Sequence, residues 1–139
     1  MSLIQKVVIA LVLVVGAICL LFQRGEQVAL SSLPRDTVIV FSKTGCSHCR
    51  EAKAFIDTIV RREYPDVPIH VLNVDKSDNM AKLWAVVRHH RLDPERVGTP
   101  LIVINDRVIM GWTKKHEKLL LSAIQALPQK SLDNRDKIG

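Results

Sequence analysis

Two cysteines separated by two residues directly follow an apolar, β-branched run, and this arrangement constrains the fold more than any other feature. The run is Thr37–Phe41 (TVIVF), and the motif is Cys46-Ser47-His48-Cys49. A helical pattern follows, so the motif lies where a strand passes into a helix. At a helix N-terminus, unpaired backbone N–H groups and the helix dipole favour a thiolate over a thiol. The sequence therefore predicts a dithiol that opens and closes a disulfide, with Cys46 as the nucleophile.

A metal site is the alternative use of such a cysteine pair. Zinc normally takes four ligands, but no second pair of ligands follows and the histidines are scattered. Two thiolates and His48 could instead hold Cu(I), because thiolates suit that ion. A soft-metal carrier stays open as an alternative function, whereas the redox interpretation needs no metal and no other cofactor.

An unbroken apolar run lies near the N-terminus. It covers Val7–Phe22, and counted from Leu3 it is about 20 residues or about 30 Å as a helix, enough to cross a bilayer. Sites for signal-peptide cleavage are poor, because Val15-Gly16-Ala17 lies inside the run and Ala29-Leu30-Ser31 lies well beyond it. We expect residues 1–23 to be an uncleaved signal anchor, with a cleaved signal peptide as the alternative.

The charges that flank the apolar run discriminate weakly between the two orientations. Lys6 and the terminal amine lie on one side, and Arg24 and Arg35 lie on the other. The short N-terminal tail fits a cytoplasmic start, and an oxidising compartment offers a dithiol domain many substrates. We therefore expect a single-pass protein of a bacterial inner membrane, with its catalytic domain in the periplasm.

The formal net charge of +6 is spread mostly over predicted helices. No nucleic-acid-binding motif accompanies it, and aromatic residues make up only 4% of the chain. The sequence therefore does not indicate a nucleic-acid partner, and the basic residues are expected on a solvated surface.

Strand and helix patterns alternate along residues 37–128, which we expect to form one α/β domain. Residues 24–36 predict an irregular juxtamembrane linker, because glycine, serine and proline discourage regular structure. Residues 129–139 are polar and predict a flexible tail. Strands are expected at 37–41, 67–74, 101–104 and 107–110, and helices at 48–62, 80–90 after an Asp78 cap, and 113–127. The order β-α-β-α-β-β-α predicts one sheet with helices on both faces.

Two stretches of the chain resemble the signatures of the glutaredoxin family. Val38–Cys49 (VIVFSKTGCSHC) is similar to the opening of a glutaredoxin, and Val97-Gly98-Thr99-Pro100 followed by Ile102–Asn105 is similar to its second signature. The resemblance covers residues 37 to about 127. It implies a thioredoxin-like fold and a thiol-disulfide oxidoreductase.

The resemblance also implies roles for individual residues. Cys46 attacks, and Cys49 resolves the mixed disulfide from one helical turn away. Lys43 matches a lysine near the thiolate, and its charge would lower the thiol pKa. Pro100 matches a cis-proline facing the cysteines, so that Thr99 offers polar contacts to an extended substrate chain.

His48 precedes the second cysteine, as in exported disulfide oxidases, which the motif also resembles. A histidine there can stabilise the Cys46 thiolate and make the disulfide more oxidising. Oxidation, reduction and isomerisation of client disulfides all stay open.

The segment after the predicted hairpin departs from the glutaredoxin pattern. Gly111–Lys115 (GWTKK) stands where the family has paired glycines and an acidic residue that hold glutathione. We assign Trp112 to an edge of the substrate groove, with core packing as the alternative. The expected partners are protein thiols and disulfides and a membrane or soluble protein that recharges the dithiol. A glutathione-dependent glutaredoxin and a binding module with a vestigial site are the alternatives.

Overall fold

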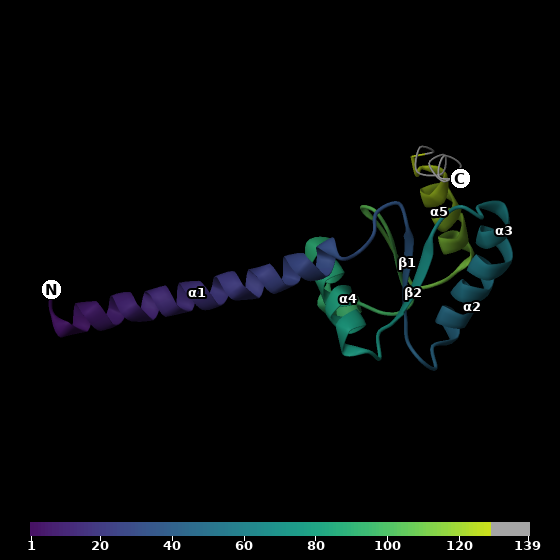
Figure 1. Ribbon diagram of the computed structural model, residues 1–139. Helices are drawn as coiled ribbons and strands as arrows, with labels where there is room; N and C mark the ends of the chain where they lie inside the picture. The colour runs from purple at the N-terminus through teal and green to yellow at the C-terminus, as the bar shows by residue number, and fades with distance from the viewer. Residues whose placement is uncertain (129–139) are drawn as a thin grey trace. The chain divides into compact units, whose positions relative to one another are not determined.

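The computed structural model describes residues 1–128, apart from the side chains of residues 25–29, and divides the chain after Leu33 into two units. The first unit consists mainly of helix α1, Leu3–Ser31 (Figure 1). Its segment Leu3–Arg24 is long and apolar enough to cross a membrane. A helix of this length and composition is compatible with an anchor and with a signal sequence.

Helix α1 continues into the segment that was expected to be an irregular linker. That expectation is wrong for residues 24–31, because the helix ends only at Ser31. A single glycine such as Gly25 costs a helix only about 1 kcal/mol relative to alanine, so it need not end one. Pro34 follows soon after the end of the helix and could not have continued it. The predicted tail at 129–139 lies outside the described residues.

A four-stranded mixed sheet forms the centre of the second unit. The strands are β1 (Val38–Ser42), β2 (Ile69–Asn73), β3 (Leu101–Ile104) and β4 (Arg107–Met110), in the spatial order β2-β1-β3-β4. β1 pairs with β2 in parallel and with β3 antiparallel, and β3 and β4 form a hairpin. Asn105 in the hairpin turn has φ 50°, a left-handed conformation that asparagine tolerates better than most residues. The predicted order of strands and helices is confirmed.

Helices cover both faces of this sheet. They are α2 (Ser47–Phe55), the π-helical turn η1 (Ile56–Val60), α3 (Arg61–Glu63), α4 (Ser77–His89), the 3₁₀ turn η2 (Pro94–Arg96) and α5 (Lys114–Gln125). α2, α3 and α5 lie on one face, and α4 lies on the other (Figure 1). Because side chains alternate along a strand, Val38 and Val40 point toward the α2 and α5 side, whereas Ile39 and Phe41 point the other way.

Strand β1 is the most deeply buried element of the sheet. All five of its residues are buried, as its nearly continuous apolar sequence predicts for a strand covered on both faces. On the α2 and α5 side the core includes Ala52, Ile56 and Val60 from the helical segment after the cysteine motif. Strand β1, which leads to the cysteines, is therefore covered by helices on both faces and paired with a neighbouring strand on both edges.

Two helices differ in detail from their sequence patterns. The helix expected at 48–62 contains a π turn at Ile56–Val60, which local periodicity does not reveal. Its buried residues Ala52, Ile56 and Val60 are four apart, and a wider turn keeps such a row facing the sheet better than 3.6 residues per turn would. Helix α4 begins at Ser77 with Lys76 at the cap position, so Asp78 lies inside the first turn rather than capping it.

Candidate active site

The cysteine motif follows β1 through a tight turn. The Cys46 N–H donates to the Lys43 carbonyl oxygen at 3.4 Å, closing a four-residue turn. Gly45 has φ +78°, a conformation that residues with a Cβ rarely adopt. The strand therefore ends, and helix α2 begins, within a turn that fixes the backbone of Cys46.

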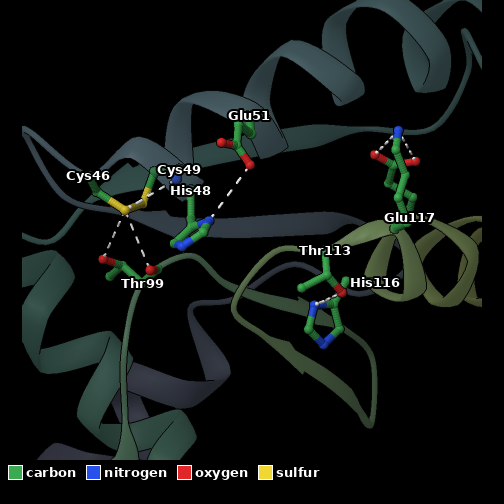
Figure 2. A network of polar contacts seen from close by, with 9 residues as sticks. Cys46, His48, Cys49, Glu51, Thr99, Thr113, His116 and Glu117 are labelled. Atoms are coloured by element: carbon green, nitrogen blue, oxygen red, sulfur yellow. Dashed lines mark hydrogen bonds and ion pairs between the residues drawn. A yellow bond between two sulfur atoms is a disulfide. The ribbon is translucent and has the colours of Figure 1, made fainter.

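Cys46 is the N-cap residue of α2, and its sulfur accepts a hydrogen bond from the Cys49 backbone N–H at 3.2 Å. The two sulfurs form a disulfide, with the Cα atoms 5.2 Å apart (Figure 2). Cys49 is fully buried, whereas Cys46 is partly exposed. An incoming thiol can therefore reach Cys46 more easily than Cys49.

Thr99 approaches the Cys46 sulfur from a distant part of the chain. Its carbonyl oxygen lies 3.4 Å from Cys46 Sγ, and its hydroxyl donates to the same sulfur at 3.6 Å (Figure 2). The pairing of Phe41 with Leu101 in the β1–β3 ladder brings these two segments together. The Thr99–Pro100 peptide bond is cis, as expected, and the Pro100 side chain is fully buried.

The groups around Cys46 Sγ have opposing effects on a thiolate there. The Cys49 N–H and the Thr99 hydroxyl are donors and favour the charged sulfur, as does the helix N-terminus. The Thr99 carbonyl oxygen carries a partial negative charge and opposes it. In the reduced protein the Cys46 thiol can donate to this carbonyl, which favours the neutral form.

Lys43 and His48 lie on the exposed rim of the site. Lys43 is in the turn before Cys46, and the His48 ring, in the first turn of α2, has Nδ1 3.7 Å from Glu51 Oε2 (Figure 2). Both side chains of this pair are 61% exposed, so their attraction is screened by water. The ion pair of a protonated His48 with Glu51 is therefore a weak one.

Trp112 lies in the hydrophobic core and not on an accessible surface. Its side chain is only 5% exposed, and its ring centroid is 5.5 Å from that of Phe55 in α2. The placement of Trp112 at the edge of a substrate groove is therefore corrected to the core-packing alternative. An aromatic ring buries a large apolar area, and here helix α2 supplies the partner for it.

A polar cluster beside the cysteine turn was missed by the sequence analysis. Asp75 Oδ2 accepts the Thr44 N–H at 3.0 Å, and the Asn73 side chain donates to the Thr44 hydroxyl at 3.3 Å. Hydrogen bonding from the Thr44 side chain and then from its amide holds the pKa of Asp75 below its usual value, and the charge of Lys43 adds to the lowering. The parallel pairing predicted for the first two strands was the available signal, because it brings their carboxyl ends together.

Among the described side chains, those of residues 1–24 and 30–128, no group of three or more His, Cys, Asp and Glu comes together in a way that could hold a metal ion. A Cu(I) site would have to use Cys46 and Cys49, which form a disulfide here.

A family model described as Glutaredoxin matches residues 38–109, which run from the start of β1 into β4 and include Cys46, Cys49 and Thr99. The chain belongs to the glutaredoxin family. The glutaredoxin domain and its Cys46–Cys49 disulfide make the protein a thiol-disulfide oxidoreductase.

Solved glutaredoxin structures are similar to this chain at low sequence identity. A buckwheat glutaredoxin–glutathione complex is 21% identical, with a TM-score of 0.46, over 84% of this chain and 91% of its own. The holo form of glutaredoxin C1 from Populus tremula x tremuloides is also 21% identical, with a TM-score of 0.48, over 80% of this chain and 88% of its own. No curated protein sequence matches the chain significantly.

We expect alkylation of the reduced protein to label Cys46 before Cys49. Cys46 is partly exposed and its sulfur accepts a hydrogen bond from the Cys49 N–H, whereas Cys49 is buried. The apparent pKa of the Cys46 thiol should lie well below the free-thiol value of about 8.5. Timed labelling across pH, with the modified cysteine located by mass spectrometry, measures both quantities. Equal labelling of the two cysteines at the unperturbed pKa would contradict the assignment.

Replacement of His48 by alanine should make the reduction potential of the Cys46–Cys49 pair more negative, by about 30 mV or more, because the thiolate loses a stabilising charge. Equilibration with glutathione buffers measures the potential. Glu51→Gln is the matched control, because it removes the partner of His48 and leaves the ring. It should leave the potential unchanged or make it more positive, and an unchanged potential in His48→Ala would remove His48 from the redox chemistry.

Proposed function

We propose that this protein is a membrane-anchored oxidoreductase that exchanges disulfides with the thiols of exported proteins. Helix α1 is its uncleaved anchor in a bacterial inner membrane, and the glutaredoxin domain works in the periplasm. The observation that carries the proposal is the partly exposed Cys46 joined to the buried Cys49, in a chain that begins with a helix of membrane-spanning length.

In the oxidising direction, a client thiolate attacks Cys46 Sγ. A bond forms between the client sulfur and Cys46 Sγ, the Cys46–Cys49 bond breaks, and Cys49 leaves as a thiolate that takes up a proton. A second client thiolate then attacks the client sulfur of the mixed disulfide, and Cys46 leaves and is protonated in turn. The client loses two electrons and two protons, which the dithiol gains.

In the reverse direction, the Cys46 thiolate attacks a client disulfide and Cys49 resolves the mixed disulfide. The two electrons and two protons then pass from the dithiol to the client. A dithiol or disulfide partner, in the membrane or soluble, returns the pair to its starting state.

Thr99 supports the binding of an extended client segment beside Cys46. It is partly exposed, and both its carbonyl oxygen and its hydroxyl lie within 3.6 Å of Cys46 Sγ. A client chain that runs past Thr99 would therefore have its own sulfur close to Cys46. In this proposal Pro100, fully buried, supports Thr99 from behind rather than touching the client with its side chain.

Polar groups after the hairpin are occupied with one another. Lys114 Nζ lies 3.0 Å from Glu117 Oε1, and the Thr113 hydroxyl lies 3.1 Å from His116 Nδ1 (Figure 2 draws the second pair). Thr113 and Lys114 belong to the Gly111–Lys115 segment, where glutaredoxins have paired glycines and an acidic residue that hold glutathione. The tryptophan and lysines of this segment in place of those residues favour protein thiols over glutathione as the substrate.

Replacement of Cys49 by alanine should trap mixed disulfides between Cys46 and client proteins, because attack can occur but resolution cannot. Cells expressing the variant are acid-quenched, and non-reducing gels reveal the adducts. Cys46→Ala should accumulate few adducts, and Cys19→Ala, which changes the cysteine in α1, should behave as the unmodified protein. Equal trapping by the two active-site variants would reverse or remove the proposed roles, and adducts with glutathione alone would favour the glutathione-dependent alternative.

The topology can be tested with reporters fused to the C-terminal end of the chain. A reporter enzyme that is active only in the periplasm should give signal, and one that is active only in the cytoplasm should not, because in this proposal the domain lies outside the cytoplasm. The mature protein should retain its N-terminal residues. A cytoplasmic signal would contradict the periplasmic location and favour a reductive role, since that compartment keeps thiols reduced. A mature N-terminus near Ser31 would show a cleaved signal.

A further inference from the structure

Asp75 contacts the turn that delivers Cys46. Its carboxylate accepts the N–H of Thr44, the second residue of the Lys43–Cys46 turn, at 3.0 Å. Thr44 is 31 residues away in sequence, so the contact is tertiary. The turn is thus held by the Cys46-to-Lys43 bond inside it and, from outside, by the Asp75 carboxylate on the Thr44 amide and the Asn73 side chain on the Thr44 hydroxyl.

The end of strand β2 holds Asp75 in place. The Asp75 N–H donates to the Asn73 side-chain oxygen at 2.9 Å, and the Asn79 side chain donates to the Asn73 carbonyl oxygen at 2.9 Å. Ser42 and Asn73 are partners in the parallel β1–β2 ladder, and the Val74 N–H donates to the Ser42 carbonyl oxygen at 2.9 Å. The sheet therefore positions this carboxylate against the turn.

Asp75 also brings a negative charge close to Lys43. Because its pKa is lowered, chiefly by the hydrogen bonds from Thr44, the carboxylate is ionised throughout the neutral pH range. Lys43 directly precedes Thr44, whose N–H the carboxylate accepts at 3.0 Å, so the two charges lie close together and attract each other, and the charge of Lys43 adds to the lowering of the pKa. Asp75 is exposed, and this attraction is partly screened by water and salt.

We propose that Asp75 is a positioning residue for the reactive cysteine, which holds the Lys43–Cys46 turn through the Thr44 amide and offsets the positive charge of Lys43 at the Cys46 sulfur. The first effect keeps Cys46 at the N-cap of α2, where the Cys49 N–H reaches its sulfur. The second effect limits the stabilisation of the thiolate. This proposal rests on the proposed role of Cys46 as the attacking cysteine.

The two effects predict different results for two substitutions of Asp75. Asp75→Asn keeps an oxygen that can accept the Thr44 N–H but removes the negative charge. The pH profile of Cys46 alkylation should then move toward lower pH by a fraction of a unit, because that is what a screened surface charge is worth, so that on the acid side of the profile Cys46 reacts about two- to threefold faster. Asp75→Ala removes both the charge and the acceptor, so its Cys46 should react at least twofold more slowly than in Asp75→Asn.

The experiment measures the pH profile of iodoacetamide alkylation at Cys46 in the reduced full-length protein in detergent micelles. The thiolate forms a bond to carbon and iodide leaves, so the assay needs no client or redox partner. Asp78→Asn is the matched control, because it removes the same charge from the first turn of α4, three residues further along the chain. The reduction potential of the pair should become more positive in Asp75→Asn, since stabilising the thiolate favours the reduced form.

Three results would overturn the proposal in whole or in part. If Asp75→Asn and Asp78→Asn give the same profile, Asp75 has no specific effect on the charge at Cys46. If Asp75→Ala and Asp75→Asn give the same profile, the carboxylate does not hold the turn. If Asp75→Asn and Asp75→Ala both give the alkylation profile of the unmodified protein, Asp75 has no positioning role. Alkylation is read independently of disulfide exchange, so these failures are distinguishable from failure of the proposed function, which the trapping variants report.

Discussion

The double pairing of β1 is the constraint on which the rest of the structure depends. Its neighbours are β2 on one edge and β3 on the other, and all five of its residues are buried. A shift of its register by one residue would turn its apolar side chains to the opposite faces of the sheet. Both faces are packed, so the shifted side chains, Phe41 among them, would meet neighbours of another shape, and such misfits typically cost about 1–3 kcal/mol each. The end of β1, and with it the start of the cysteine turn, therefore has a fixed place.

The same pairing selects the groups that surround the reactive sulfur. The antiparallel partner β3 brings Thr99 to Cys46, and the parallel partner β2 brings Asp75 to Thr44. Donors from Cys49 and Thr99 favour a thiolate, whereas the Thr99 carbonyl oxygen opposes it. The charge state of the Cys46 sulfur in the reduced protein thus depends on a balance of small electrostatic effects, several of them from residues outside the four-residue motif.

The two units of the chain suit two different solvents. The glutaredoxin domain has a core of its own, built from both faces of its sheet. None of the membrane-length segment Leu3–Arg24 is buried in the structure, although it is almost entirely apolar. An apolar surface of this extent is unfavourable in water. In the function that we propose, this segment lies in a lipid bilayer, whose interior is itself apolar.

Local sequence by itself determined the strand that precedes the motif, the helix that follows it and the place of Cys46 at the start of that helix. These features depend on residue periodicity and on helix-end chemistry within a few positions of each other. The second signature and the order of elements were enough to indicate the glutaredoxin fold. Only the tertiary structure decided that Trp112 packs on Phe55, and that Asp75 reaches the turn before Cys46. Each of these contacts joins two segments that are far apart in the sequence and become neighbours only when the chain folds. No local sequence pattern therefore predicts them.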